Sequence, residues 1–227
     1  MSHNITIIDK YKSTYEKQRA EIIRSIYSNI LFEKNWKILD IGGGIGFHAD
    51  MLKKYSDNII ILDSRKENVY ICTNKGYKAL VLNVDKGLPF SESSFNFINA
   101  LEIIEHLISP TSFINEIKRV LKPYGYLVIS TPNRHSLEGL KGKIEEITIG
   151  RSWNAWDDTH KHIFSYNEFI GAIESHFEII ACIGYYLGFM IKRKHLPPFL
   201  WRIKFKNNFL KKFCFSTIVV ARNKKFE

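Results

Sequence analysis

Short apolar runs without alternating polar residues recur along the first 130 positions, and most of them end at glycine or aspartate. A strand that packs against helices on both faces has this pattern, because neither face meets water. A strand with one exposed face would instead alternate apolar and polar residues. The pattern therefore predicts five buried strands: 36–41, 58–63, 79–84, 95–100 and 126–130.

Stretches with apolar residues three or four positions apart separate these runs, and this is the spacing of an amphipathic helix. Pro110 lies near one predicted start, and Gly76 follows one predicted end. Ser165 with Glu168 has the pattern of a capping box. The predicted helices are 11–32, 47–55, 65–75, 110–121 and 165–175. Strands that alternate with helices in this way predict a doubly wound, mostly parallel sheet with helices on both faces.

The regular alternation of strands and helices ends after position 131. The stretch 136–158 is mixed and predicts no single element, whereas 177–183 and 214–220 are apolar enough for two final strands. We therefore divide the chain into four parts. They are an N-terminal helical lid (1–35), a core with a cap segment near 135–160 (36–184), an aromatic and basic insertion (185–212) and a final core strand (213–227).

Composition narrows the class of protein and its partners. The length of 227 residues suits one α/β domain, and 45% hydrophobic residues are enough for a full core. The net charge of +10 favours anionic partners, although an evenly charged surface explains it equally well. Three widely spaced cysteines, Cys72, Cys182 and Cys214, suit a reducing compartment. With a polar start and no long apolar segment, we expect a cytoplasmic protein, with peripheral membrane contact left open.

A glycine-rich turn, residues 42–46, follows the first predicted strand. Glycine permits a tight turn and a close approach of the backbone to a ligand. Asp63 ends the second strand, where an acid can accept both ribose hydroxyls, and Asp85 follows the third, where it can accept from an adenine amino group. Each aspartate alone could cap the next segment, but together these features line the crevice that binds ligands in open sheets. The glycine spacing is not that of the dinucleotide motif, which disfavours a dinucleotide oxidoreductase.

Several of these segments together carry a family resemblance. Residues 38–46 resemble the first motif of class I S-adenosylmethionine (SAM)-dependent methyltransferases. Residues 88–98 are similar to their approach to the fourth strand, with Asn96 where aspartate is usual. Residues 119–125 resemble the segment before their fifth strand, with tyrosine in place of one glycine. The resemblance covers about residues 36–177. It implies a Rossmann-like, seven-stranded, mostly parallel sheet whose last strand is antiparallel.

The same resemblance implies a binding site for SAM. Asp40, Gly42 and Gly44 are expected to face the methionine part of the cofactor, Asp63 the ribose and Asp85 the adenine. Because these residues are all present, a non-catalytic partner subunit with a methyltransferase fold is disfavoured. The full predicted cofactor set is Asp40, Gly42, Gly44, Gly46, Asp63, Ser64, Asp85 and Leu101.

A cluster of acids and a histidine follows the fourth predicted strand: Glu102, Glu105 and His106. Their position places them at the carboxyl edge of the sheet, over the crevice. Carboxylate oxygens and imidazole nitrogens suit Mg²⁺ or another divalent cation. Such a cation can hold a hydroxyl group and lower its pKa. The cluster is similar to that of small-RNA 3′-terminal 2′-O-methyltransferases and of ubiquinone-pathway O-methyltransferases.

In both of these families a later histidine completes the metal site. Residues 158–165 resemble the corresponding segment of the ubiquinone-pathway enzymes, which implies that His160 is the fourth ligand, that His162 is excluded and that His135 is a weaker candidate. An alternative has equal weight: the Glu-His pair serves loop geometry, and His160 contacts substrate or caps the next helix. The predicted metal ligands are Glu102, Glu105, His106 and His160.

The histidines also bear on the acceptor. Methyl transfer from a sulfonium mainly requires alignment of the reacting atoms. A hydroxyl acceptor must in addition lose a proton, which His106 or His160 as a general base, or a bound cation, can provide. Amine and carbon acceptors need no such group, so we expect O-methylation of a small molecule, a glycan or a lipid-linked intermediate. An RNA 2′-O-methyltransferase is the alternative, favoured by the cluster and the charge and disfavoured by the lack of a separate RNA-binding module.

The insertion at 185–212 alternates bulky apolar and cationic residues. This pattern suits a cap over the acceptor, contact with an anionic or membrane surface, or stacking on RNA. Packing against the domain, with lysine side chains reaching into water, is the favoured interpretation for most of these residues. Further candidates for the walls of the site are Trp153, Trp156, Tyr11, Tyr15 and Arg19.

Overall fold

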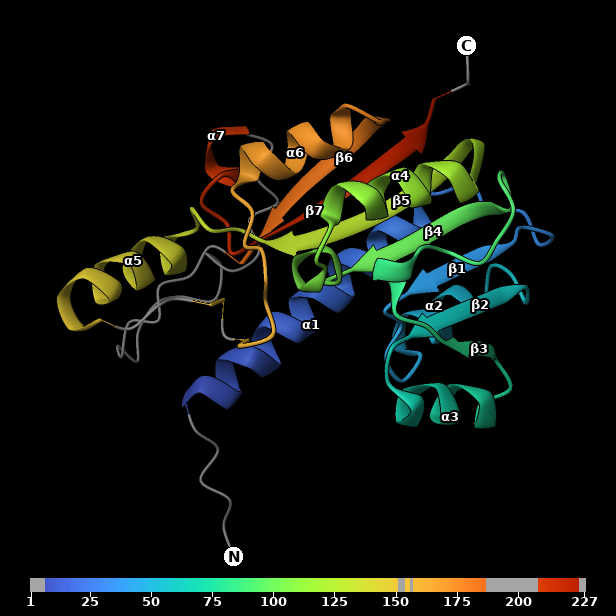
Figure 1. Ribbon diagram of the computed structural model, residues 1–227, viewed down its shortest axis with the longest axis horizontal. Coiled ribbons are helices and arrows are strands. Elements are labelled where there is room, and N and C mark those ends of the chain that lie inside the picture. Colours follow the sequence, from blue (N-terminus) through green and yellow to red (C-terminus); the bar gives the residue numbers. More distant parts are fainter. Residues whose placement is uncertain (1–6, 151–153, 156, 187–207, 225–227) are drawn as a thin grey trace, which may run out of the picture.

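The computed structural model describes residues 7–150, 154–155, 157–186 and 208–224. Seven strands form one sheet in the order β3-β2-β1-β4-β5-β7-β6 (Figure 1). β7 is antiparallel to both of its neighbours, and the pairs from β3 to β5 are parallel. The predicted fold class is therefore confirmed. The strands are β1 (Ile38–Ile41), β2 (Ile59–Asp63), β3 (Lys78–Val81), β4 (Phe95–Leu101), β5 (Leu121–Pro132), β6 (Phe177–Tyr185) and β7 (Ser216–Asn223).

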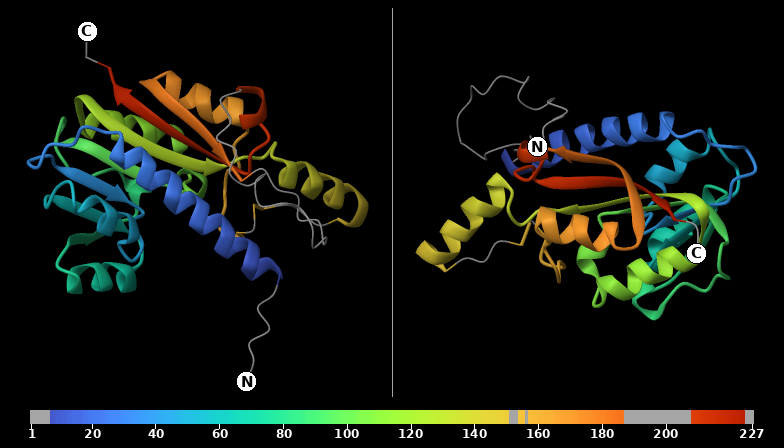
Figure 2. Two further views of the ribbon diagram at one scale, coloured as in Figure 1. Left: turned by 180° about the vertical axis from the view of Figure 1, so that it is seen from behind. Right: turned by 90° about the horizontal axis from the view of Figure 1, so that it is seen from above.

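Helices cover both faces of this sheet (Figure 2). The first three pack with one of the two hydrophobic clusters, and the fourth and sixth pack with the other. The helices are α1 (Ile7–Ser28), α2 (Phe47–Leu52), α3 (Lys66–Asn74), α4 (Pro110–Val120), α5 (Leu137–Ile149), α6 (Tyr166–Glu174) and α7 (Asn208–Lys211). Two 3₁₀ turns, η1 (Val84–Lys86) and η2 (Ile104–His106), follow β3 and β4.

Successive side chains of the central strands point to opposite faces of the sheet, and both faces are buried. Ile38 of β1 packs in the cluster that contains Ile23 of α1, and its neighbour Leu39 packs in the cluster that contains Phe113 of α4. Both faces of the sheet are dry, which explains why the strands show no apolar–polar alternation. Asp40 near the end of β1, Asp63 at the end of β2 and Glu102 directly after β4 lie at the carboxyl edge of the sheet.

The predicted elements agree with the structure except at some ends. The capping box of α6 is confirmed, since Ser165 Oγ accepts from the Glu168 N–H and Glu168 accepts from the Ser165 N–H. The prediction that the third strand extends to position 84 was wrong. The strand ends at Val81, because the Asn83 side chain accepts from Asp85 N–H and caps the 3₁₀ turn η1.

Helix α5 was not predicted. It begins after Ser136, whose Oγ accepts from the Gly139 N–H, and it projects away from the sheet (Figure 1). Its apolar residues Leu140, Ile144 and Ile147 are exposed and do not join the core. Such a helix is hard to predict from the sequence. Its glycines lower the helix propensity, and its apolar residues do not form a stripe that faces the core.

The leading helix α1 belongs partly to the core. Ile23, Ile26 and Tyr27 are buried against the sheet. The division of the chain into a lid, a core, an insertion and a final strand stays a prediction, and most of the 185–212 insertion lies outside the described residues. Among the described residues, no helix has both the length and the apolar content needed to cross a bilayer.

Candidate functional site

The glycine turn after β1 is shaped by its backbone. The amides of Gly42 and Gly43 both donate to the carbonyl of Leu62 at the end of β2, at 2.8 and 3.1 Å. Gly42 and Gly44 have φ angles of +67° and +56°, a region that suits glycine. A Cβ atom on Gly43 would lie 2.7 Å from Ile61 Cγ2 and 2.8 Å from a carboxylate oxygen of Asp40. The turn therefore has no room for a side chain at its second glycine.

Asp63 connects the glycine turn to the end of β2. Its Oδ2 accepts from the Gly44 N–H at 3.0 Å. Its Oδ1 accepts from the Arg65 N–H at 2.9 Å and from the Asn68 side chain at 3.0 Å. The predicted ribose-binding carboxylate is thus buried and held in a fixed position directly behind the turn.

Asp40 lies beneath the turn and is fully buried. Its Oδ1 accepts from the Asn99 side chain at 2.7 Å, and Asn99 in turn accepts from the Tyr27 hydroxyl at 2.8 Å. Its Oδ2 has no hydrogen-bond partner among the described residues. Burial raises the pKa of Asp40 to about 7, although the hydrogen bond from Asn99 lowers it. This carboxyl group can therefore change its charge near neutral pH.

A cavity of about 710 Å³ opens between the glycine turn and α1. Its walls come from the turn, from the start of α2, from the end of β4 and from a charged face of α1. The lining residues are Glu16, Lys17, Arg19, Ala20, Glu21, Arg24, Gly42, Gly43, Gly44, Ile45, Phe47, His48, Arg65, Leu101 and Glu102. The size suits a cofactor or a drug-sized molecule.

The structure brings only part of the predicted cofactor set to this cavity. Gly42, Gly44 and Leu101 line it, and so does Arg19 of α1. The other members lie outside the lining. Asp85 is one of them, and its Oδ1 accepts a hydrogen bond from the backbone N–H of Ile108, in the loop after η2, at 2.8 Å. The predicted cofactor residues outside the lining are Asp40, Gly46, Asp63, Ser64 and Asp85.

One lining residue, His48, was missed by the sequence analysis. Burial, together with the positive charge of Arg19, lowers the pKa of His48 to about 4, so the ring is neutral at physiological pH. Its Nε2 has no hydrogen-bond partner among the described residues. A histidine directly after a glycine turn has no motif of its own in the sequence. Only the approach of α1 shows that this residue faces a cavity.

A second group of side chains lies beyond the end of β4. Glu105 and His106 lie in η2, and His160 comes from the loop before α6. Two backbone hydrogen bonds join these segments: the carbonyl of Glu105 accepts from the amides of Lys161 and His162 at 2.9 and 3.0 Å. The structure therefore brings His160 next to Glu105 and His106, the residues with which the resemblance had grouped it.

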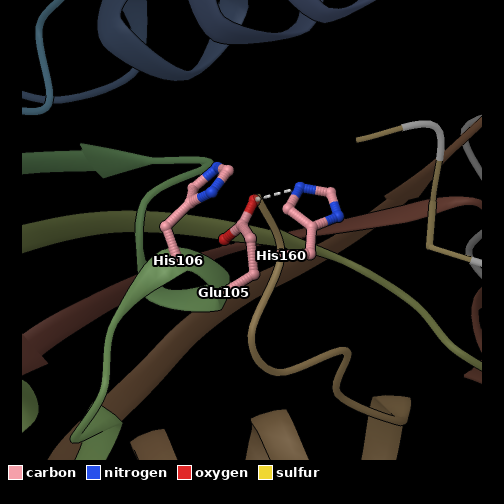
Figure 3. A group of neighbouring side chains, drawn as sticks. All are labelled: Glu105, His106 and His160. Carbon is pink, nitrogen blue, oxygen red and sulfur yellow. Dashed lines mark ion pairs between the residues drawn. The ribbon is translucent and has the colours of Figure 1, made fainter. Parts of the chain in front are cut away.

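The Glu105 carboxylate lies beside the two imidazole rings (Figure 3). His160 Nε2 is 4.0 Å from Glu105 Oε1, and the two ring centroids are 4.7 Å apart. One potential ligand atom from each of the three residues lies within 4.8 Å of the others. Glu105 is fully buried, and neither of its carboxylate oxygens has a hydrogen-bond partner among the described residues. Burial raises the pKa of Glu105 well above its ordinary value, and the nearby charge of Glu102 raises it further.

Each imidazole is held by its other nitrogen. His160 Nδ1 is 2.8 Å from the carbonyl oxygen of Asn154, and His106 Nδ1 is 2.9 Å from the hydroxyl oxygen of Thr159. Burial and the proximity of His160 lower the pKa of His106. A neutral imidazole can accept a proton or bind a cation, whereas an imidazolium can do neither.

Glu102, which was also predicted as a metal ligand, is not part of this group. Its Oε1 accepts from the Ser130 hydroxyl at 2.7 Å, and its backbone has a φ of +53°, which is unusual for a residue other than glycine. Glu102 lines the cavity at the glycine turn instead. It therefore lies where the cavity and the histidine group meet.

Several other candidates are not at the site or cannot be placed. His162, which was excluded as a ligand, and His135, the weaker candidate, are both exposed and outside the group. Trp153 and Trp156 lie outside the described residues, and so do the side chains of Tyr11 and Tyr15.

Comparison with known proteins gives consistent matches. Residues 15–170 match the family described as "Methyltransferase domain". A protein of Mycobacterium tuberculosis described as a probable SAM-dependent methyltransferase is 30% identical over 98 residues, which are 43% of this chain and 36% of that protein. The ubiquinone biosynthesis O-methyltransferase of Rickettsia prowazekii is 30% identical over 149 residues, which are 63% of this chain and 57% of that protein.

The fold also matches solved structures. A SAM-dependent methyltransferase from Thermotoga maritima superimposes with a TM-score of 0.65, at 16% sequence identity and with 96% of each chain covered. At this identity the match concerns the fold alone. The matched segments span about a third to just over half of the length of the curated relatives.

Proposed function

Because this chain belongs to the methyltransferase domain family, we propose that it transfers a methyl group from SAM to a hydroxyl group of a small acceptor. We further propose that Glu105, His106 and His160 hold a divalent cation at the acceptor. The observation that carries both proposals is the buried Glu105 carboxylate, which has no hydrogen-bond partner among the described residues and lies beside the imidazoles of His106 and His160. It lies next to Glu102, a lining residue of the cavity at the glycine turn.

The cavity at the glycine turn supports SAM as the cofactor. The turn presents the half-buried backbone of Gly42 and Gly44 to the cavity, where a ligand can approach closely. Asp63 is held directly behind the turn, at the position where an acid receives ribose hydroxyls. SAM supplies a methyl group on a positively charged sulfur. Arg19 and Arg24 lie across the cavity, where their side chains can receive the carboxylate of the methionine part.

The histidine group fits a divalent cation. Buried polar atoms almost always have a partner, so two unpartnered carboxylate oxygens indicate a group that binds there. Both imidazoles use Nδ1 for protein contacts, and Nε2 of His160 lies 4.0 Å from Glu105 Oε1. Donor atoms within 4.8 Å of one another can reach one ion after small side-chain rotations, with bonds of about 2.0–2.2 Å. A bound cation would lower the pKa of an acceptor hydroxyl.

A hydroxyl acceptor is the class that needs this group. Transfer to oxygen requires removal of a proton, and His106 or His160 can take it at Nε2 if no cation is bound. An amine acceptor gains little from either a bound cation or a histidine general base. Several relatives are named for ubiquinone biosynthesis O-methylation, among them proteins from Rickettsia prowazekii and Aliivibrio fischeri, and they support an oxygen acceptor. The acceptor itself is proposed as a small molecule, a glycan unit or a lipid-linked intermediate.

Two measurements test this function. The chain is first treated with EDTA, and Mn²⁺ binding is then measured by calorimetry in the presence of S-adenosylhomocysteine. We expect one Mn²⁺ site in the wild type and none in Glu105→Gln, while both proteins bind S-adenosylhomocysteine. Equal Mn²⁺ binding by both proteins would contradict the metal site.

The second measurement uses SAM with a radioactive methyl group and matched acceptors. Catechol and 1,2-phenylenediamine have the same ring and differ only in oxygen against nitrogen. We expect label on catechol after Mg²⁺, Mn²⁺ or Zn²⁺ is added back and little label on the diamine. Transfer that EDTA leaves unchanged would favour a histidine general base over a cation, and preferred transfer to the diamine would contradict O-methylation.

A further inference from the structure

The two histidines of the site are held in different ways. His160 Nδ1 faces a backbone carbonyl, that of Asn154, at 2.8 Å. A carbonyl only accepts hydrogen bonds, so His160 must carry its proton on Nδ1. Its Nε2 then has a free lone pair on the side of Glu105. His106 Nδ1 instead faces the Thr159 hydroxyl, which can both donate and accept.

Asp157 decides the direction of that hydrogen bond. The Thr159 hydroxyl lies 2.6 Å from Asp157 Oδ1, and the Thr159 backbone N–H also donates to this oxygen at 2.8 Å. A carboxylate accepts only, and a hydroxyl has a single proton to donate. That proton is used toward Asp157. The Thr159 oxygen therefore accepts from His106, and the His106 proton must lie on Nδ1.

We infer that Asp157 and Thr159 are positioning residues that hold His106 as the Nδ1–H tautomer, which leaves the proton off its Nε2. The series runs from His106 Nδ1–H to Thr159 Oγ1 and from Thr159 Oγ1–H to Asp157 Oδ1. Its contribution to catalysis rests on the proposed function, whereas the tautomer itself does not. Neither Asp157 nor Thr159 contacts the reacting atoms in this assignment.

The two histidines thus reach the same state by different means. A backbone carbonyl fixes His160, and a side-chain pair fixes His106. Both rings then present an unprotonated Nε2, which is the form required either to bind a cation or to accept a proton. If the Thr159 hydroxyl turned its proton to His106 Nδ1, the ring proton would move to Nε2 and neither role would be open to this residue.

The tautomers can be read directly by ¹⁵N NMR of the histidine rings in the full chain. In the wild type we expect both His106 and His160 with the proton on Nδ1. In Asp157→Ala the Thr159 hydroxyl is free to donate to His106, so the share of the Nδ1–H tautomer of His106 should fall and that of Nε2–H should rise. Thr159→Val should weaken the preference for Nδ1–H, because the acceptor is lost, and Thr159→Ser should restore it.

Two internal controls accompany these variants. His160 should keep its Nδ1–H form throughout, which shows that the loop still folds. Asp158→Ala removes the same charge from the same loop, but Asp158 contacts the Asn154 side chain and not Thr159, so His106 should keep its tautomer. A wild-type His106 with its proton on Nε2, or an unchanged tautomer in Asp157→Ala while His160 is intact, would overturn the inference.

Kinetic constants of the Thr159 variants distinguish a role in orienting His106 from a role in folding. Loss of a residue that orients a site imidazole typically lowers activity about 10–100-fold. We expect this loss in kcat for Thr159→Val, with the KM for SAM unchanged and with recovery in Thr159→Ser. If the tautomers behave as expected but no methyl transfer to oxygen is found, the positioning series stands and the proposed function fails.

Discussion

The cavity at the glycine turn and the group formed by Glu105, His106 and His160 lie side by side but are built differently. The turn is a contiguous stretch, residues 42–46, whose shape comes from backbone hydrogen bonds and positive φ angles. The histidine group joins η2 to a loop that is distant in the sequence. Two amides that donate to the Glu105 carbonyl hold these segments together.

This difference determines what each region tolerates. A backbone site fails when a side chain is added, because the space is already filled. A side-chain site fails when its polar atoms are changed, although its scaffold survives. Changes at the histidine group should therefore lower the rate of methyl transfer and spare cofactor binding, whereas changes at the turn should weaken both the fold and cofactor binding.

The largest expected effect is on turnover at the histidine group. Removal of a proton acceptor or cation ligand in Glu105→Gln or His160→Ala should lower kcat about 10²–10⁴-fold. The dissociation constant for S-adenosylhomocysteine, measured by calorimetry, should not change. His162→Ala is the matched control, because His162 is exposed, lies in the same loop and is outside the group. Full activity in His160→Ala would remove this histidine from the site.

The next effect concerns the charge beneath the turn. The pKa of Asp40 is about 7 in the folded state, against about 3.8 for the free side chain, so the folded protein binds more protons than the unfolded chain between these values. Stability should therefore fall as pH rises from 4 through 7. Asp40→Asn removes this dependence. Its stability relative to wild type should increase over that range by about 2–4 kcal/mol, at about 1.4 kcal/mol per pKa unit.

The measurement is chemical denaturation of both proteins from pH 4 to pH 8. The variant must be compared with wild type, because His48 acts in the opposite sense. Its pKa, lowered to about 4, makes stability rise between about pH 4 and pH 6.5. Asp57→Asn, which removes an exposed carboxylate, is the control. A pH-independent difference between Asp40→Asn and wild type would mean that Asp40 is ionised throughout.

A smaller loss of stability is expected at the turn itself. The Cβ of Gly43→Ala would meet Ile61 and Asp40 at less than 3 Å, so the fold should lose about 1–3 kcal/mol and bind S-adenosylhomocysteine weakly. Gly171→Ala in α6 is the control, since no atom lies within 4 Å of its added Cβ. Denaturation and calorimetry check both variants. Normal cofactor affinity in Gly43→Ala would show that the turn adjusts its backbone.

The same contrast explains what the sequence could predict. The strands, the glycine turn and Asp63 were found because their signals are local: apolar runs, glycine spacing and an acid at a strand end. Helix α5 was missed because Leu140, Ile144 and Ile147 face away from the core. Its apolar residues therefore do not follow from burial.

The histidine group could be predicted only in part. Glu105 and His106 are adjacent and at a strand end, but His160 was placed by family resemblance rather than by any spacing. The exclusion of Glu102 from the group depends on the Ser130 hydroxyl of the next strand, which no local pattern reveals. The roles of Asp157 and Thr159 depend on which atom donates to which, and this requires coordinates.

The smallest expected effect tests how the loop that carries His160 is held in place. Lys161 Nζ lies 3.9 Å from Asp85 Oδ2, and about half of the lysine side chain is exposed. Such pairs contribute about 0–1 kcal/mol and weaken in salt. Lys161→Met keeps the backbone N–H that donates to the Glu105 carbonyl, so the melting temperature and kcat should change little. In 0.5 M salt, where the screening length is roughly 4 Å, any difference between the variant and the wild type should disappear. A loss of kcat as large as that of His160→Ala would mean that the side chain, and not the backbone, holds the loop against η2.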